Sequence, residues 1–192
     1  MIAPSDTDRL YVLTGGPGAG KTTLVEALAK AGYAISPEAG RGVIKDQAAI
    51  EGQALPWSDP GLYAELMLSW DMRSHHLARR RSGPVFFDRS VLDTIGYLRL
   101  LGRTVPVHMD KAATMFRYNR RVFIAPPWPE IFEQDSERRQ TLDEATRTYE
   151  AMVTTYRDYG YELQELPRVS VDERVEYIAA QLPTAFATRN RP

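Results

Sequence analysis

The chain has 192 residues, of which 43% are hydrophobic and 26% charged, and its formal net charge is −1. This composition is typical of a globular domain with a substantial core, and the near-neutral charge argues against a nucleic-acid partner. The absence of cysteine excludes disulfides and cysteine-ligated metal sites and fits a cytoplasmic protein. The polar start lacks the pattern of a signal peptide, and no apolar run is long enough to predict a membrane span. We therefore expect one cytoplasmic domain over residues 1–192.

Short apolar runs alternate with helical patterns along the whole chain. In chain order, the sequence predicts a strand at 10–14, a helix at 20–31, a strand at 33–36, a helix at 38–51, a loop at 52–61 and a long amphipathic helix at 62–81. It then predicts a strand at 83–88, helices at 90–101 and near 107–118, a strand at 121–125, a helix ending at Gly160, a strand at 161–167, a helix at 171–182 and a flexible tail at 183–192. Strands that alternate with helices predict an α/β fold, with ligands at the carboxyl ends of parallel strands.

The stretch GGPGAGKT at residues 15–22 matches G-x-x-x-x-G-K-[ST] between a predicted strand and a predicted helix, as a phosphate-binding P-loop requires. Glycines let successive backbone N–H groups point at phosphate oxygens, and the helix start adds a partial positive charge. The predicted nucleotide-binding set is Gly15, Gly16, Pro17, Gly18, Ala19, Gly20, Lys21, Thr22 and Thr23. In this motif Lys21 contacts the terminal phosphates and Thr22 ligates Mg²⁺. A chance glycine-rich turn is the alternative, and the flanking elements argue against it.

A second candidate group follows the predicted strand of VFFDRS at residues 85–90. An acidic residue at the end of this strand would lie beside the P-loop, so Asp88 is the predicted second Mg²⁺ ligand. Arg89 would point into the same cleft, where its planar fork suits a phosphate or a substrate oxygen. The alternative is that Asp88 and Ser90 only cap the next helix while Arg89 is a surface charge.

A third candidate lies in ISPEAGR at residues 35–41, where Pro37 ends the predicted strand. Glu38 would then lie at the carboxyl edge of the sheet, within reach of an acceptor hydroxyl as a general base must be. Arg41, one helical turn later, would bind substrate or orient Glu38. The alternative is a glutamate that is favoured only by the partial charge of a helix start.

Taken in order, GGPGAGKT, PEAGR, FFDRS and a later charged segment with two arginines resemble small P-loop kinases and ATPases of the nucleoside and nucleotide kinase type. Nicotinamide riboside kinase-like domains and AAA-labelled predicted ATPases are similar in the same way. The resemblance covers about residues 10–170. It implies a P-loop NTPase fold of three α/β/α layers, with a five-stranded parallel sheet in the order 2-3-1-4-5 and a lid at about 127–142.

For individual residues, the resemblance implies that Lys21 and Thr22 bind ATP and Mg²⁺, and that Glu38 is the acceptor-side base or a substrate ligand. It implies metal and substrate roles for Asp88 and Arg89. Deoxynucleoside kinases have glutamate at the position of Asp88, so the resemblance does not imply which acceptor is used.

Further candidates come from the lid and from the segment that crosses the carboxyl edge of the sheet. In kinases of this type, arginines of the lid stabilise the transferred phosphoryl group, and the closed lid excludes water. The segment 133-EQDSERRQ-140 contains two candidates for this role, Arg138 and Arg139. The alternative is that this segment is a solvated helix face. Four aromatic side chains are candidates for stacking on an acceptor ring, namely Trp57, Tyr63, Trp70 and Tyr97. The alternative is that they pack in the core. Arg168, after the last predicted strand, is a candidate for stacking on adenine.

These patterns predict a Mg²⁺-dependent phosphotransferase that uses ATP, with GTP as the alternative donor, and acts on a small hydroxyl-bearing metabolite such as a nucleoside. An NTP-hydrolysing or NTP-sensing module that acts through a protein partner is the alternative. A nucleic-acid-processing protein is disfavoured by the near-neutral charge, and Arg79, Arg80 and Arg81 are interpreted as a solvated helix end. No feature of the sequence indicates an oligomeric state.

Overall fold

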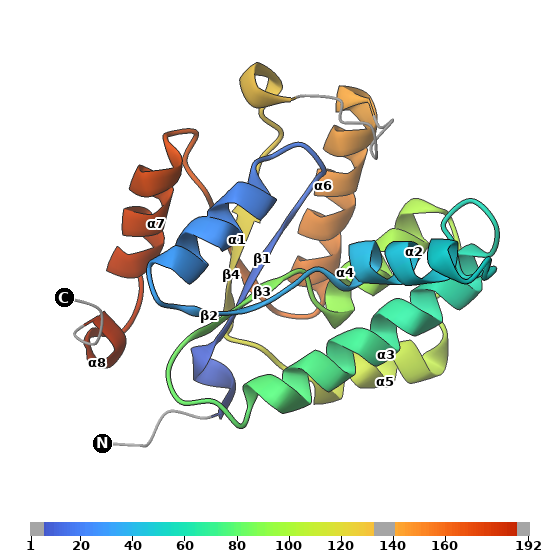
Figure 1. Ribbon diagram of the computed structural model, residues 1–192, viewed down its shortest axis with the longest axis horizontal. Helices are drawn as coiled ribbons and strands as arrows, with labels where there is room; N and C mark the ends of the chain where they lie inside the picture. Colours follow the sequence, from blue (N-terminus) through green and yellow to red (C-terminus); the bar gives the residue numbers. More distant parts are fainter. Residues whose placement is uncertain (1–5, 133–140, 188–192) are drawn as a thin grey trace.

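Five parallel strands in the order β2-β3-β1-β4-β5 form the centre of the computed structural model, which describes residues 6–132 and 141–187 (Figure 1). The strands are β1 (Leu10–Gly15), β2 (Ala34–Ser36), β3 (Val85–Asp88), β4 (Arg121–Ala125) and β5 (Glu162–Glu165). This order and the parallel pairing confirm the predicted P-loop NTPase sheet.

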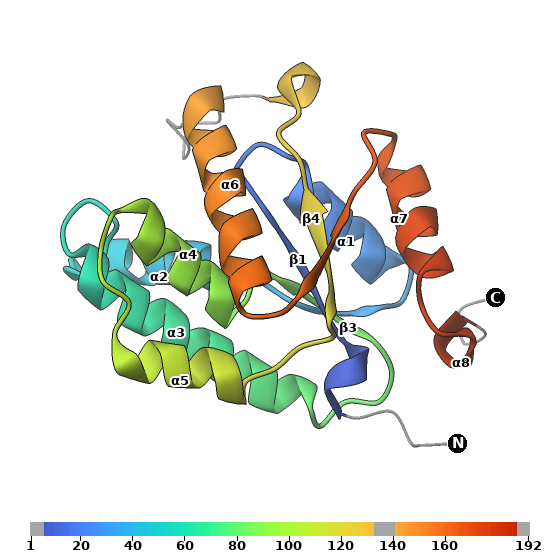
Figure 2. The same cartoon turned by 180° about the vertical axis from the view of Figure 1, so that it is seen from behind.

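The helices connect the strands and cover both faces of the sheet (Figures 1 and 2). They are α1 (Lys21–Lys30), α2 (Ala39–Ala49), α3 (Pro60–Ala78), α4 (Val91–Leu100), α5 (Val107–Met115), α6 (Leu142–Asp158), α7 (Val171–Ala180) and the short α8 (Thr184–Ala187), with 3-10 turns η1 (Asp6–Arg9) and η2 (Pro129–Ile131). Helices α1 and α7 lie on one face, and α3, α4, α5 and α6 lie on the other. The three-layer α/β/α arrangement is as the sequence predicts.

Strand β1 illustrates why the central strands are apolar on both sides. All six of its residues are buried. Leu10 and Val12 belong to the hydrophobic cluster under α3–α6, whereas Tyr11 and Leu13 belong to the cluster under α1 and α7. Because side chains alternate along a strand and both faces are covered, a buried parallel strand has a nearly continuous apolar sequence.

Helix α3 starts earlier and ends earlier than the predicted range 62–81. Its start is fixed by Asp59, whose Oδ1 accepts hydrogen bonds from the backbone N–H groups of Gly61 and Leu62, each at 3.0 Å, with Pro60 in the first turn. Its end is bound by Arg9, whose Nη1 donates to the carbonyl of Ala78 at 3.0 Å. The predicted loop at 52–61 is therefore wrong in its last two residues.

The carboxyl-terminal half also has clear helix boundaries. Thr141 starts α6 with a capping box, because its Oγ1 accepts from the Glu144 N–H at 3.2 Å while Glu144 Oε2 accepts from the Thr141 N–H at 2.7 Å. Part of the predicted tail at 183–192 forms α8, and residues 188–192 lie outside the described part of the chain. Among the helices described, none combines the length and apolar character that a membrane span requires.

We expect Gly15→Ala to destabilise the fold far more than Gly83→Ala. Both glycines have positive φ, 126° and 83°, but a Cβ on Gly15 would lie 2.3 Å from the Ala125 carbonyl oxygen, whereas one on Gly83 meets nothing within 4 Å. Gly83→Ala is the control, and it should lose about 1 kcal/mol of unfolding free energy because only the backbone conformation becomes unfavourable. Gly15→Ala should lose more than about 3 kcal/mol in urea denaturation. Equal losses of unfolding free energy in the two variants would show that β4 moves to accommodate the new methyl group.

Candidate active site

The predicted P-loop forms a tight turn between the end of β1 and the first residue of α1. Gly15, Gly18 and Gly20 have φ values of 126°, 71° and 72°, which side-chain-bearing residues rarely adopt. Gly20 is the residue before α1 and has no side chain to cap the helix. The first N–H groups of α1 are therefore left for a ligand, and this is the arrangement that binds anions at helix starts.

Lys21 lies inside this loop, with a side chain that is only 6% exposed. Its Nζ donates hydrogen bonds to the carbonyl oxygens of Gly16 at 2.6 Å and Gly15 at 3.2 Å. Burial, and then the nearby Arg89 charge, lower the pKa of Lys21 to about 8. Thr22 and Thr23 follow at the start of α1 and are exposed. The ammonium is thus held beside the place where this motif binds phosphate.

The outer side of the loop is closely packed, which gives the glycines a second reason to be small. A Cβ on Gly16 would lie 2.3 Å from the carbonyl oxygen of Ala145 in α6. One on Gly18 would lie 2.4 Å from Cδ2 of Phe132, which follows η2. The loop is therefore supported from behind by α6 and by the segment after β4.

That second segment is the described beginning of the predicted lid at 127–142. Residues 127–132 run from β4 across the P-loop and include η2, and Thr141 already caps α6. Arg138 and Arg139 lie outside the described residues, so their role at the transferred phosphoryl group stays a prediction.

Asp88 ends β3 next to the P-loop and is 5% exposed. Its Oδ1 is buried and has no hydrogen-bond partner among the residues the structure describes. Burial raises the pKa of Asp88, although the positive charge of Lys21 opposes this shift. A buried carboxylate oxygen without a partner fits a ligand of a bound cation. Asp88 does not cap α4, because that is done by the Ser90 hydroxyl, which accepts from the Leu92 N–H at 3.2 Å.

Arg89 has an unusual backbone conformation, and its side chain makes several polar contacts. Its φ is 73°, which is rare for a residue with a side chain. Its Nε donates to Glu38 Oε1 at 2.9 Å and its Nη1 to Asp93 Oδ1 at 3.1 Å. Glu38, Asp93 and Asp88 outweigh the effect of burial and raise the pKa of Arg89. The alternative interpretation of Arg89 as a surface charge is therefore wrong.

Glu38 precedes α2 and is 18% exposed at its side chain. Burial alone would raise its pKa, but the charges of Arg89, Lys21 and Arg41 lower it. Arg41 Nε lies 3.7 Å from Glu38 Oε2, and its role in binding substrate or orienting Glu38 stays a prediction. Glu38 is thus an ionised carboxylate held between two guanidinium groups.

The site forms because β2, β3 and β1 are neighbours in the sheet. Glu38, Asp88 and Lys21 follow or end these three strands on the carboxyl edge, where parallel sheets bind ligands. Groups that are far apart in the sequence therefore meet at one edge.

The predicted aromatic residues divide into two groups. Tyr63 and Tyr97 pack edge to face with ring centroids 5.5 Å apart, and the Tyr63 hydroxyl lies against Gly40, two residues after Glu38. The Tyr97 hydroxyl is buried without a partner among the described residues. By contrast, Trp70 packs over Gly42 of α2, and Trp57 is 69% exposed. Substrate contacts of all four aromatic residues stay predictions.

Arg174 of α7 supports the P-loop and was not predicted from the sequence. It is 1% exposed, and its Nη1 donates to the Ala19 carbonyl at 3.2 Å while its Nε donates to the Pro167 carbonyl at 3.0 Å. Its guanidinium lies 5.1 Å from the centroid of the Trp128 ring. Arg168, the predicted adenine-stacking residue, is exposed in the loop between β5 and α7. Of these two arginines, Arg174 is therefore the one that contacts the P-loop.

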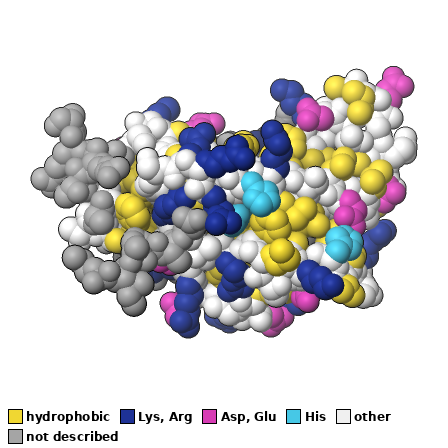
Figure 3. Space-filling view, turned by 90° about the horizontal axis from the view of Figure 1, so that it is seen from below, with side chains coloured by type: hydrophobic (Ala, Val, Ile, Leu, Met, Phe, Trp, Pro, Cys, Tyr) yellow, Lys and Arg dark blue, Asp and Glu magenta, His cyan; other side chains and the backbone are white. Residues whose placement is uncertain are grey.

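Two other features lie outside this site. Figure 3 shows the face at the amino ends of the strands, opposite the P-loop, where Lys and Arg side chains gather near the middle. The exposed Arg79, Arg80 and Arg81 end α3 on this side. Their position agrees with the interpretation of a solvated helix end.

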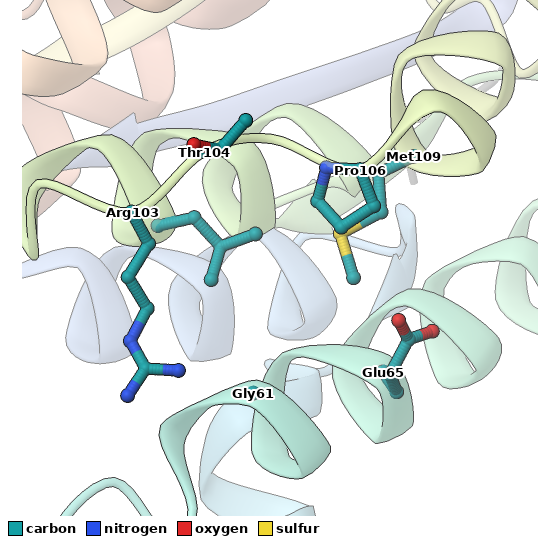
Figure 4. A pocket seen from close by; sticks show the side chains of 7 residues that line it. Gly61, Glu65, Arg103, Thr104, Pro106 and Met109 are labelled. Carbon is teal, nitrogen blue, oxygen red and sulfur yellow. The ribbon is translucent and has the colours of Figure 1, made fainter.

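A cavity of about 280 Å³ lies between the start of α3, the end of α4 and α5 (Figure 4). Its lining consists of Gly61, Glu65, Leu98, Arg103, Thr104, Pro106 and Met109. None of the predicted site residues lines it. Among the described residues, no group of three or more His, Asp or Glu side chains is arranged to hold a metal ion.

Comparison with known proteins agrees with this geometry. A sequence-family profile described as an AAA domain matches residues 10–174. A search of curated proteins gives no match. Among solved structures, the fold is similar to NadR protein in complex with NR, with a TM-score of 0.66 and 17% identity over 92% of this chain. The match covers 52% of the NadR chain, so this chain spans about half of that protein.

Two further structures are matched over almost their whole length. Deoxyadenosine kinase from M. mycoides has a TM-score of 0.65 and 15% identity, over 90% of this chain and 98% of that one. Thymidylate kinase from Ehrlichia chaffeensis has a TM-score of 0.62 and 14% identity, over 91% and 98%. At such identities these structures show a shared fold, which is that of P-loop kinases.

We expect Arg174→Ala to lower the free energy of unfolding by about 2–4 kcal/mol, because it removes the hydrogen bonds to the Ala19 and Pro167 carbonyls and the contact with Trp128. Arg168→Ala is the matched control, and its loss should stay within about 0.5 kcal/mol because its side chain is exposed. Both values come from chemical denaturation. If the two losses were equally small, the Arg174 contacts would contribute no net stability.

Proposed function

The chain belongs to the AAA domain family, and we propose that it is an ATP- and Mg²⁺-dependent phosphotransferase acting on a small hydroxyl-bearing metabolite. The observation that carries this proposal is the position of Glu38, an ionised carboxylate at the same sheet edge as the P-loop and bound to Arg89. A P-loop alone binds nucleotide, whereas an oriented carboxylate beside it can accept the proton of an acceptor.

The donor half of the proposed reaction uses the P-loop. Backbone N–H groups and Lys21 would hold the phosphates of ATP, with GTP as the alternative donor. Lys21 Nζ would exchange its bonds to the Gly15 and Gly16 carbonyls for phosphate oxygens. The close packing of Phe132 and α6 against Gly18 and Gly16 would support the loop from behind.

Thr22 and Asp88 are the residues that would hold Mg²⁺. The partnerless Asp88 Oδ1 and the exposed Thr22 hydroxyl at the start of α1 are hard oxygen donors that suit this ion. When bound, Mg²⁺ supplies positive charge that neutralises the phosphates.

The acceptor half of the proposed reaction uses Glu38. The acceptor hydroxyl would give its proton to Glu38 as its oxygen forms a bond to the γ-phosphorus, and the bond from that phosphorus to the leaving ADP oxygen breaks. Glu38 Oε1 accepts from Arg89 Nε, and Glu38 Oε2 lies 3.7 Å from Arg41 Nε, so the two guanidinium groups would hold the carboxylate in place as the hydroxyl approaches. Arg89 would also stabilise charge on the phosphoryl group.

We expect ADP release to rise at least about tenfold over basal hydrolysis with one class of acceptor, in a panel of nucleosides and other hydroxyl compounds whose products are identified by mass.

Glu38→Gln should lower transfer by about 10²-fold or more while nucleotide binding is retained, because the amide cannot take the proton. Glu65→Gln, which changes an acid of α3 that is paired with His108 instead, should transfer at the wild-type rate.

Other outcomes would contradict the proposal. Turnover that is equal with every acceptor and increases only with a protein partner would favour an NTP-driven module. Full activity of Glu38→Gln would remove Glu38 from the mechanism.

The affinity for nucleotide should decrease as pH rises through about 8, the pKa of Lys21 in the free protein. The ammonium is protonated below this pH and increasingly neutral above it, and phosphate binds the charged form. The dissociation constant should thus rise by up to about tenfold per pH unit. Titration calorimetry between about pH 7 and 9.5 measures this, and Lys21→Arg should flatten the profile because guanidinium stays charged. A flat wild-type profile would contradict the expectation.

A further inference from the structure

We propose that Asp93 is a positioning residue that fixes Arg89, and through Arg89 the Glu38 carboxylate, in the acceptor half of the site. This role rests on the proposed phosphotransferase function. Asp93 lies in the first turn of α4 and is 6% exposed. A capping role alone would require only its bond to the Ser90 backbone.

Both carboxylate oxygens of Asp93 are fully engaged. Oδ1 accepts from Thr14 Oγ1 at 2.6 Å and from Arg89 Nη1 at 3.1 Å. Oδ2 accepts from the Ser90 N–H at 3.0 Å and from the Tyr156 hydroxyl at 2.5 Å. Since a carboxylate offers about four acceptor sites, Asp93 has none left for a ligand. It therefore acts on the site only through the groups that it binds.

Three of these donors hold Asp93 in place independently of Arg89. Thr14 comes from β1, Ser90 is the N-cap residue of α4, Tyr156 comes from α6, and all three are buried. Burial, and then the Asp93 charge, raise the pKa of Tyr156 well above its usual value, so the phenol keeps its proton and donates it. The Ser90 hydroxyl lies 2.7 Å from the Tyr156 hydroxyl and completes the network. Asp93 is thus held in place by its own partners, and the Arg89 side chain is oriented against it.

Arg89 needs such an anchor. Its left-handed backbone conformation is unfavourable by about 1–2 kcal/mol and persists only where the surroundings impose it. With Nη1 held by Asp93, Nε is directed at Glu38 Oε1. If Asp93 lost its charge, Glu38 would be the one anion still bound to Arg89 by an ion pair among the described residues. Arg89 Nη1 would then keep its bond to the Gly15 carbonyl at 3.3 Å but lose its ionic partner, so Arg89 would orient Glu38 less firmly, with Arg41 as the other guanidinium beside that carboxylate.

The test is a double-mutant cycle on kcat, with the acceptor found in the panel. Asp93→Asn should lower kcat at least about tenfold while the dissociation constant for nucleotide changes less than about twofold. In the Arg89→Ala background, the same Asp93→Asn change should lower kcat less than about twofold further, because its effect passes through Arg89. If Asp93→Asn lowers kcat by the same factor in both backgrounds, the positioning role is overturned.

Tyr156→Phe is the matched control, because it removes another donor to Asp93 and leaves the Arg89–Asp93 pair intact. It should lower the free energy of unfolding like Asp93→Asn but keep kcat within about threefold of wild type. Equal losses of kcat in the two variants would show a merely structural network. If Asp93→Asn fails to fold, Asp93→Glu replaces it in the same cycle, and a loss of kcat that persists with Arg89→Ala overturns the proposal.

A wild-type protein that transfers phosphate to no acceptor would contradict the proposed function separately. The positioning role of Asp93 is then tested by the ¹³C NMR signal of the Glu38 carboxyl group in labelled protein. This signal is assigned by its disappearance in Glu38→Gln. Asp93→Asn, or Asp93→Glu if the asparagine variant does not fold, should shift this signal, whereas Tyr156→Phe should leave it in place. An unshifted signal in the Asp93 variant overturns the positioning role.

Discussion

The guanidinium of Arg89 lies between the carboxylates of Glu38 and Asp93, and the carboxyl edge of the sheet is organised around this contact. A charge that is removed from water is stabilised only when partners and hydrogen bonds replace its hydration. Here the partners come from different elements, since Glu38 precedes α2 and Asp93 belongs to α4, and Arg89 Nη1 also donates to the Gly15 carbonyl at 3.3 Å. One partly buried cation therefore joins the P-loop to Glu38.

Much of the architecture follows directly from the amino-acid sequence, for physical reasons. Strands that are covered on both faces must be apolar throughout, so β1, β3 and β4 stand out as short apolar runs. The P-loop is equally visible, because its backbone conformation and its contacts with α6 leave room only for glycine at fixed positions. The strand ends then locate Glu38 and Asp88 without any tertiary information, because parallel strands share one carboxyl edge. The start of α3 was missed because Asp59-Pro60 is as typical of a turn as of a helix cap.

The remaining site residues could not be found in this way, because their partners leave no trace in the sequence. Arg174 is one of several charged residues on an amphipathic helix, and it binds a backbone carbonyl 155 positions earlier, which any residue could supply. Asp93 fits the spacing of a capping box, and that local role hides its contacts with Thr14 and Tyr156. The sequence offers one signal for Asp93, because it is the first acidic residue after the DRS motif at 88–90. Burial of a charged side chain becomes visible only when the elements are assembled.

The central place of β1 has a consequence for how the protein acquires its function during synthesis. This strand carries the P-loop near the amino terminus, yet it pairs with β3 and β4, whose residues Val85 and Ala125 lie opposite Leu10 and Gly15. Pairings between segments so distant in the chain form slowly, because the intervening chain must be ordered first. A nascent chain cannot complete the walls of its phosphate loop until β4 has left the ribosome. The loop can thus reach its packed shape only after β4 and α6 have been made, long after its own residues.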